Sequence, residues 1–308
     1  MHNVDAPIKA KNVRSKDGTR IRYYVAGNGK KVIVLCPGMG TPMNSFKKII
    51  ESFYGRYKII TWECRSSYSS ETPKDLTRLG IMDHVEDLAA ICKSEKLDRF
   101  ILGGWSMGVQ VSLEFYHQYP KKVRGLVLIN GTYEHILDTA IRPLPYPRPI
   151  LSTLSKTAIA IHPLINPIIR VFLGSWFSPF ILRTATFVGD HEDFFLDTLS
   201  DFSQHRWQLY FTMMLQVQQH SAAAYLKDVC VPTLITAGTK DRLTPHEKIL
   251  WMHRQISGSE VFLFPCGTHF SMFEYPEILN LRLEKFLRKL DPELFEIGRL
   301  SKERTEQA

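Results

Sequence analysis

The chain has 308 residues, of which 44% are hydrophobic and 23% charged, and its formal net charge is +8. This composition is typical of a globular protein with a large core and excludes a disordered chain. The basic residues form separate pairs without interleaved aromatic residues, so we expect no nucleic-acid partner. The length indicates a main domain with an insertion.

Five scattered cysteines, without a CxxC pair or zinc-ligand spacing, are typical of reduced thiols. The first twelve residues are polar and unlike a secretory signal. No uninterrupted apolar run reaches the roughly 18–20 residues that a spanning helix needs. Prolines and an arginine interrupt the nearest candidate, residues 157–182. We therefore expect a cytoplasmic protein.

Short β-branched apolar runs alternate with helical patterns in the first part of the chain. We expect strands at residues 20–26, 31–36, 57–62, 99–103 and 123–130. Helices are expected from about 42 to 55, from 82 to 95 and from 107 to 119. This alternation is the pattern of a parallel sheet covered by helices on both faces.

The alternation stops at residue 131, where prolines and aromatic residues with helix-like spacing begin. It resumes with strands at 230–237 and 260–264 and helices at 246–255 and 276–290. The sequence thus predicts a doubly wound, mostly parallel α/β core domain of residues 1–130 and 227–308. Residues 131–226 are predicted to be a helical cap or lid.

The pentapeptide at 104–108, GWSMG, fits the G-x-S-x-G pattern. It follows an expected strand and opens an expected helix, which would lift the hydroxyl of Ser106 to the end of the sheet on a sharp turn. The alternative is a turn of small residues without chemistry. Its context favours Ser106 as a nucleophile, which needs a base to accept its proton.

His269 is the candidate base, because its loop lies directly after the last expected strand, at the same sheet edge as Ser106. The ten other histidines fall on helices, in the insertion or near the N-terminus. Asp241, just after the expected strand 230–237, is the candidate for orienting that histidine. The alternative is that Asp241 caps the following helix. A rival acid after residues 123–130 is not available, because Asn130 stands there.

Two backbone N–H groups should stabilise the oxyanion that attack on a carbonyl creates. Met107 is expected to supply one from the start of its helix. Met39, in the glycine-rich loop after residues 31–36, is expected to supply the other.

With these motifs in place, the sequence resembles the α/β-hydrolase superfamily from about residue 12 to 290. PGMG, WECRSSYSS, GGWSMG, GTKDRLTP and GTHF occur in family order. The sequence is most similar to the cap-bearing serine esterase and lipase-like group, which implies an α/β-hydrolase fold with a helical cap after the sixth strand. Family epoxide hydrolases and dehalogenases carry an Asp at the elbow, where this chain has Ser106.

The chain departs from that family at two places. Pro37 stands where many relatives have the histidine of a His-Gly pair, which affects the orientation of the oxyanion loop. Residues 63–70, ECRSSYSS, replace a more glycine-rich turn and make it bulkier.

The apolar, proline-rich insertion admits three interpretations. It could line an apolar acyl or alkyl pocket as a lid, form its own core against the sheet, or contact a membrane weakly around residues 159–182.

Together these features predict hydrolysis of a carboxylic ester with an apolar part, through an acyl-enzyme and without metal or cofactor. The alternatives are C–C bond or lactone hydrolysis with the same three residues, and a non-catalytic ligand-binding protein of the same fold. The expected partner is a small-molecule ester, and the sequence leaves the oligomeric state open.

Overall fold

The computed structural model describes residues 6–138, 147–175 and 203–295. Its centre is an eight-stranded sheet with the strand order β1-β2-β4-β3-β5-β6-β7-β8. The strands are β1 (Ile8–Arg14), β2 (Arg20–Ala26), β3 (Lys31–Cys36), β4 (Tyr57–Trp62), β5 (Phe100–Trp105), β6 (Val123–Ile129), β7 (Thr233–Gly238) and β8 (Glu260–Phe264). β1, β2 and β4 pair antiparallel, and the other neighbours pair parallel. The predicted doubly wound, mostly parallel sheet is confirmed.

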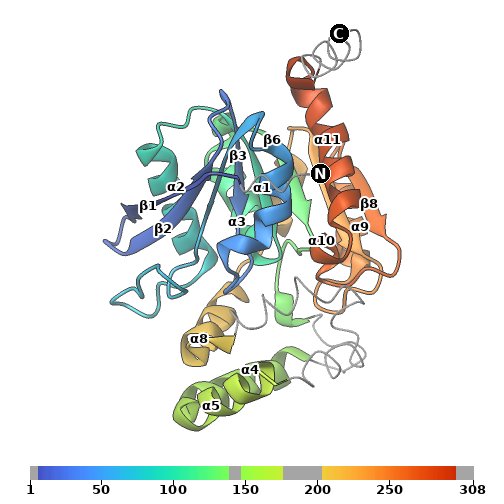
Figure 1. Cartoon of the computed structure of the whole chain (residues 1–308). Coiled ribbons are helices and arrows are strands. Elements are labelled where there is room, and N and C mark those ends of the chain that lie inside the picture. Colours follow the sequence, from blue (N-terminus) through green and yellow to red (C-terminus); the bar gives the residue numbers. More distant parts are fainter. Residues whose placement is uncertain (1–5, 139–146, 176–202, 296–308) are drawn as a thin grey trace.

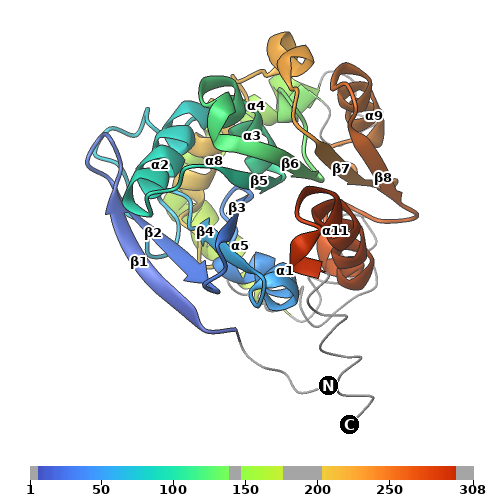
Figure 2. The ribbon, with the colours of Figure 1, turned by 90° about the horizontal axis from the view of Figure 1, so that it is seen from above.

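Helices cover both faces of this sheet (Figure 2). One face packs against α2 (Ile81–Ser94), α3 (Met107–Gln118) and α9 (His246–Gln255). The other packs against α1 (Lys47–Phe53), α10 (Ser271–Glu274) and α11 (Pro276–Leu290).

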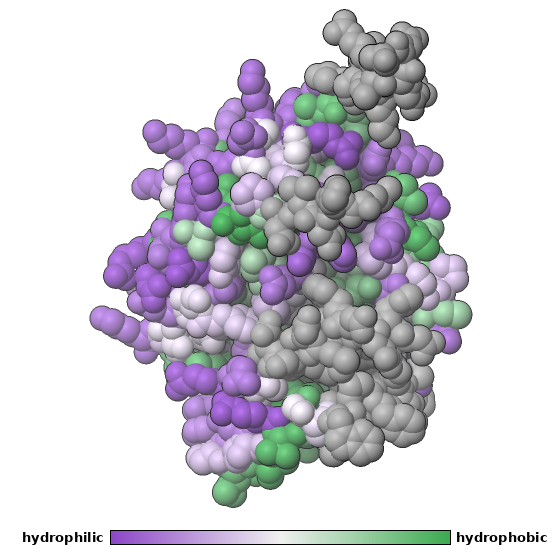
Figure 3. Space-filling view, in the orientation of Figure 1, coloured by the Kyte–Doolittle hydropathy of each residue, from purple (hydrophilic) through white to green (hydrophobic). Residues whose placement is uncertain are grey.

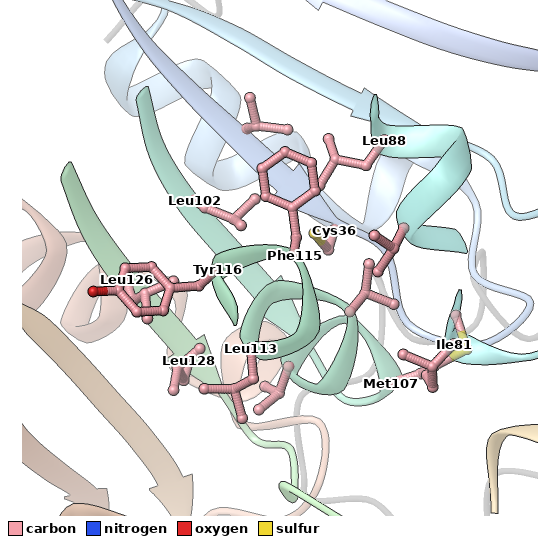
Figure 4. Packing of buried hydrophobic residues seen from close by; sticks show 14 of the residues in the cluster. Cys36, Ile81, Leu88, Leu102, Met107, Leu113, Phe115, Tyr116, Leu126 and Leu128 are labelled. Carbon is pink, nitrogen blue, oxygen red and sulfur yellow. The ribbon is translucent and has the colours of Figure 1, made fainter. Parts of the chain in front are cut away.

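The central strands are apolar on both sides because both faces are buried. Along β3, Val34 and Cys36 join the cluster on the α2 and α3 side, whereas Ile33 and Leu35 join the opposite cluster. Figure 4 shows how α3 fills the first cluster, with Phe115 packed among apolar side chains of neighbouring elements. Burying each such side chain contributes about 1.5–3 kcal/mol to folding. The sheet is therefore a rigid platform for the loops at its edges.

The segment between β6 and β7 contains helices and, in its described residues, no strand. Within those described residues the helices are α4 (Pro147–Ala160), α5 (His162–Leu173) and α8 (Trp207–Val217), with 3₁₀ turns at Ile136–Asp138 and Ala223–Asp228. Figure 1 shows α8 beyond one edge of the sheet and α4 and α5 farther out. Residues 139–146 and 176–202 of the predicted insertion lie outside the described residues. Its division from the core at 131 and 226 stays a prediction.

The observed elements differ from the expected ones at a few ends. β1 was not expected because IKAKNVR is mostly exposed and polar, yet it pairs with β2 along all seven residues. β7 begins at Thr233 rather than 230, because Pro232 has no N–H for a sheet hydrogen bond. β5 runs on to Trp105, directly before the predicted elbow.

Candidate active site

Ser106 lies at a sharp turn between the end of β5 and the start of α3. Its φ of 56° is in the left-handed region, which is strained for a residue with a side chain. The backbone N–H of Ser106 donates to the carbonyl of Ile129 at 3.0 Å, which ties the turn to β6. A Cβ on Gly104 would lie only 2.1 Å from the carbonyl oxygen of Gly108. The turn therefore needs the small residues of the predicted pattern.

The three predicted side chains meet at the carboxyl edge of the sheet. His269 Nε2 lies 2.8 Å from Ser106 Oγ, and His269 Nδ1 lies 2.9 Å from Asp241 Oδ2. Because Nδ1 faces a carboxylate, it carries the ring proton, and Nε2 accepts the hydrogen bond of the serine hydroxyl. The arrangement gives an alcohol, a base and an orienting acid in one line of contacts.

The carboxylate of Asp241 is fully buried and hydrogen-bonded at both oxygens. Oδ1 accepts the backbone N–H groups of Leu243 at 2.9 Å and Thr244 at 2.7 Å, and Oδ2 accepts the Thr244 hydroxyl at 2.6 Å. Burial opposes the charge of Asp241, but His269 and Thr244 outweigh it and hold the pKa of Asp241 below its usual value. Asp241 thus orders its own loop with one oxygen and contacts His269 with the other. It does not cap α9, whose N-cap residue Pro245 has no side-chain cap hydrogen bond, so the capping alternative is wrong.

A second set of buried groups fixes the loop of His269. The Thr268 backbone N–H donates to Glu274 at 2.8 Å, and the Thr268 carbonyl accepts the Asn130 amide at 3.0 Å. The indole N–H of Trp105 donates to the His269 carbonyl at 3.3 Å. These contacts join the loop to β5, the end of β6 and α10, so the imidazole is held on rigid elements.

The two predicted backbone donors occupy the expected elements. Met107 is the first residue of α3, and Met39 is partly buried in the loop after β3. In that loop Gly40 has a φ of 66°, and its carbonyl accepts hydrogen bonds from the Tyr68 hydroxyl at 3.1 Å and from His205 Nε2. Two side chains distant in sequence therefore fix the carbonyl of Gly40, in the loop that carries Met39.

The other described histidines have their own environments. The imidazole of His84 is buried without a hydrogen-bond partner among the described residues, and burial lowers its pKa to about 3. His220 contacts Glu114 at 3.0 Å and His253 contacts Ser259 at 2.7 Å. Among the described residues, Ser106 has His269 as its histidine neighbour.

Sequence reasoning did not identify Thr244, Tyr68 or His205 as site residues. Thr244 stands three residues after Asp241, a spacing at which a threonine commonly bonds an Asp side chain, so that signal was available. His205 and Tyr68 lie far from residue 40 along the chain, and no local pattern joins them.

This sheet, with a serine elbow after β5 and an acid and a histidine after β7 and β8, has the arrangement of the α/β-hydrolase fold. A family model described as "alpha/beta hydrolase fold" matches residues 31–147. An esterase from Exiguobacterium antarcticum superposes with a TM-score of 0.75 at 18% identity, covering 91% of this chain and 100% of that one. An enol-lactonase from Burkholderia xenovorans LB400 superposes with a TM-score of 0.72 at 17% identity, covering 90% and 99%.

Curated relatives agree with this assignment. The mouse protein "Serine hydrolase BPHL" is 24% identical over 88% of this chain and 84% of its own length. The bovine protein "ABHD8" is also 24% identical, but the match spans only 58% of that longer protein. The chain has the α/β-hydrolase fold that the sequence resemblance implied, and its residues 31–147 match the family model. Its place in the cap-bearing esterase and lipase-like group stays a prediction.

Proposed function

We propose that the protein hydrolyses a carboxylic ester with an apolar acyl or alkyl part through an acyl-enzyme at Ser106. The observation that carries this proposal is the pair of contacts at His269, 2.8 Å to the serine oxygen and 2.9 Å to the buried carboxylate. A neutral serine hydroxyl is a weak nucleophile, and a base so placed activates it by accepting its proton.

In the first half of the reaction, Ser106 Oγ attacks the carbonyl carbon while His269 Nε2 takes its proton. Asp241 holds the ring and stabilises the imidazolium that forms. The backbone N–H groups of Met39 and Met107 stabilise the oxyanion. The C–O bond then breaks, and the imidazolium gives its proton to the leaving alcohol.

In the second half, a water molecule gives a proton to His269 and attacks the acyl carbon. Collapse of the second oxyanion releases the acid and returns the proton to Ser106. This route uses the chain's own groups and water, in line with the expectation that no cofactor is needed.

An aromatic side chain beside the histidine supports an apolar substrate part. The partly exposed ring of Phe270 lies edge-on to His269 with 5.6 Å between ring centroids. Trp105, whose ring centroid lies 5.7 Å from that of His269, is buried in the core and supports the histidine. An aromatic surface such as Phe270 favours alkyl or aryl groups over charged ones.

Fluorophosphonate labelling and ester hydrolysis test the proposal together. The wild-type chain should be labelled once, at Ser106, and should hydrolyse p-nitrophenyl esters in a manner that depends on acyl length. Ser106→Ala should lose both the label and turnover. Ser112→Ala is a matched control, because Ser112 lies buried on α3 and donates to the Gly108 carbonyl at 2.8 Å, away from His269. Hydrolysis that persists in Ser106→Ala would reject the serine mechanism.

The structural similarity to an enol-lactonase favours a lactone as the second candidate substrate, since a lactone is a cyclic ester open to the same attack. The panel should therefore include lactones and, for the C–C alternative, vinylogous diketones. A chain that neither reacts with the fluorophosphonate nor hydrolyses any of these would instead be a non-catalytic ligand-binding protein.

A further inference from the structure

Apolar side chains are concentrated on the outer helices of the insertion. Of the 13 exposed large hydrophobic residues in the described part of the chain, six lie on α4, on α5 or between them. They are Ile150, Leu154, Ile161, Leu164, Ile168 and Val171, with exposed fractions from 41% to 72%. We call these six residues the α4–α5 surface. Single exposed apolar residues are ordinary, but such a concentration marks a binding surface.

The spacing places these residues on continuous helix faces. Ile150 and Leu154 are four apart on α4, while Leu164, Ile168 and Val171 are spaced four and three apart on α5. α5 has no buried residue at all. In Figure 3, apolar side chains gather at the end of the molecule where Figure 1 places α4 and α5.

The charge of the same segment has one sign. Residues 147–175 contain Arg148, Lys156 and Arg170 and neither Asp nor Glu. An apolar face flanked by cations complements a layer of anionic phospholipid headgroups above acyl chains. Arg148 lies 3.6 Å from the carboxylate of Asp138, so Lys156 and Arg170 are the cations of this segment that have no ion pair among the described residues. Pairing with a second copy of the chain would bring these two cations toward two others, which disfavours self-association.

The shape of the helix pair suits a membrane surface better than a membrane span. In the described residues, no individual helix combines the length and apolar composition of a span. Residues 148–160 and 162–173 together meet those criteria, but the pair bends by 105°. Two short helices at such an angle can lie in the plane of the interface, each with its apolar face toward the acyl chains.

We propose that the α4–α5 surface docks the protein on an anionic phospholipid bilayer. The predicted cytoplasmic location supports this partner, because the cytoplasmic leaflet carries anionic lipids. The sequence predicted a weak membrane contact around residues 159–182. The proposal assigns this contact to the α4–α5 surface, residues 150–171, and residues 176–182 lie outside the described residues.

The segment that carries the α4–α5 surface begins at the same edge of the sheet as Ser106. β5 and β6 are parallel, so Ser106, which follows β5, and the insertion, which follows β6, both begin at the carboxyl edge. If the proposed ester hydrolysis holds, the bilayer would supply the apolar substrate; this step rests on that proposed function, whereas the docking does not.

Vesicle flotation with the full-length Ser106→Ala variant tests docking without hydrolysis. Vesicles of phosphatidylcholine with phosphatidylserine should carry the protein upward, and phosphatidylcholine alone should bind it less tightly. Each cation near an anionic surface changes affinity about fivefold. Adding Lys156→Gln and Arg170→Gln should therefore weaken binding to the anionic vesicles about 25-fold.

The apolar half of the surface is tested by adding Leu164→Glu and Ile168→Glu to the same variant. Both side chains are about two-thirds exposed, at 67% and 64%, so the fold should tolerate the change, and circular dichroism checks it. Binding should fall at least tenfold, which corresponds to a loss of about 1.4 kcal/mol in binding free energy. Leu281→Glu is the matched control, since Leu281 is 68% exposed on α11, and it should bind like its parent.

The proposal would be overturned if the protein did not bind anionic vesicles, or if the Leu164→Glu/Ile168→Glu variant bound them as tightly as its parent. It would also be overturned if analytical ultracentrifugation showed a dimer that the two substitutions dissociate, while neither the dimer nor the variant bound vesicles. Because the assay uses Ser106→Ala, its failure is separate from failure of the hydrolase proposal. Hydrolysis of a soluble short-chain ester by the otherwise wild-type Leu164→Glu/Ile168→Glu chain should stay unchanged.

Discussion

Thr244 binds Asp241 at both carboxylate oxygens, through its backbone N–H at 2.7 Å and its hydroxyl at 2.6 Å. The same Oδ2 that accepts the hydroxyl lies 2.9 Å from His269 Nδ1. Hydrogen bonds to a buried carboxylate stabilise its charged form and fix its direction. We infer that Thr244 is a positioning residue for His269.

Thr244→Val removes the hydroxyl and keeps the shape of the side chain. Loss of one hydrogen bond to a charged group costs about 1.5–3 kcal/mol, so kcat should fall about 10-fold to 100-fold. KM should change little, because the hydroxyl faces Asp241. Thr244→Ser keeps the donor and should recover most of the rate. Equal kcat in the valine variant and the wild type would show that the backbone N–H groups suffice.

Asp241→Asn tests the orienting acid directly. The amide replaces an acceptor by a donor at His269 Nδ1, which favours the wrong tautomer and leaves Nε2 protonated toward Ser106. We expect kcat to fall by about 10⁴. Steady-state kinetics on one ester and the rate of fluorophosphonate labelling should decline together. Full activity in Asp241→Asn would move the acid to another residue.

Tyr68 and His205 both donate hydrogen bonds to the Gly40 carbonyl in the loop after β3. Burial lowers the pKa of His205, which keeps the ring neutral, although the hydrogen bond to Gly40 opposes this. Tyr68→Phe and His205→Phe should each lower kcat about tenfold, with KM nearly unchanged, if their contacts with the Gly40 carbonyl hold the loop that carries the Met39 N–H.

Two further measurements separate this positioning role from a loss of stability. Affinity for a boronic acid that mimics the tetrahedral intermediate should fall in parallel with kcat/KM. The effects in the double variant should be less than additive, since both groups act on one carbonyl. Tyr119→Phe is the control, because Tyr119 is 38% exposed and directly follows the C-terminal end of α3, the end opposite Ser106. Weaker kcat with unchanged boronate affinity would contradict the role.

How far the sequence predicts this structure depends on whether a signal is local. The strands at 20–26, 31–36 and 57–62 are observed with the expected bounds, because their apolar runs end at turn residues. β1 has no such run, since it is an edge strand with mostly exposed side chains, and only its pairing with β2 defines it.

The residues of the site also differ in how far the sequence predicts them. Chain order and position after a strand were enough to predict that Ser106, Asp241 and His269 lie together, because parallel strands end at one edge of the sheet. The groups that hold them are set by tertiary packing. Asn130 illustrates this: the sequence showed only that it is not an acid, whereas the structure shows its side chain bridging Thr268 at 3.0 Å and Ser271 at 2.7 Å.

The close packing of the elbow predicts that a side chain at Gly104 destabilises the fold. A Cβ on Gly104 would meet the Gly108 carbonyl oxygen at 2.1 Å and the Ser112 hydroxyl at 2.7 Å, both within the packed core. Gly104→Ala should therefore lower the free energy of unfolding by at least about 2 kcal/mol, as overpacking does, and reduce hydrolysis. Gly55→Ala is the control, because nothing lies within 4 Å of its added Cβ. Urea unfolding measures both, and an equally stable Gly104→Ala chain would contradict the crowding seen here.

The hydrogen bonds of Glu95 predict that it stabilises the fold less as the pH falls. Its carboxylate accepts hydrogen bonds from Lys11 at 2.7 Å, Lys58 at 2.6 Å and Tyr23 at 2.7 Å, and so ties β1, β2 and β4 to the end of α2. Burial alone would raise the pKa of Glu95, but these three donors outweigh it and lower the pKa to about 2 from an ordinary 4.5.

The sign of the pH effect follows from this lowered pKa. Glu95 binds a proton more readily in the unfolded chain, so its contribution to stability is complete above about pH 4.5 and is lost as the pH falls toward 2. Glu95→Gln should lower the free energy of unfolding at pH 7, and the difference from wild type should shrink between pH 4.5 and 2. Urea unfolding at several pH values measures this difference.

Glu51→Gln is the control, since Glu51 contacts Lys47 and Lys48 only at 3.7 and 3.8 Å, and it should change stability little. A difference between Glu95→Gln and wild type that stays constant down to pH 2 would mean that Glu95 stabilises the fold by its shape and not by its charge.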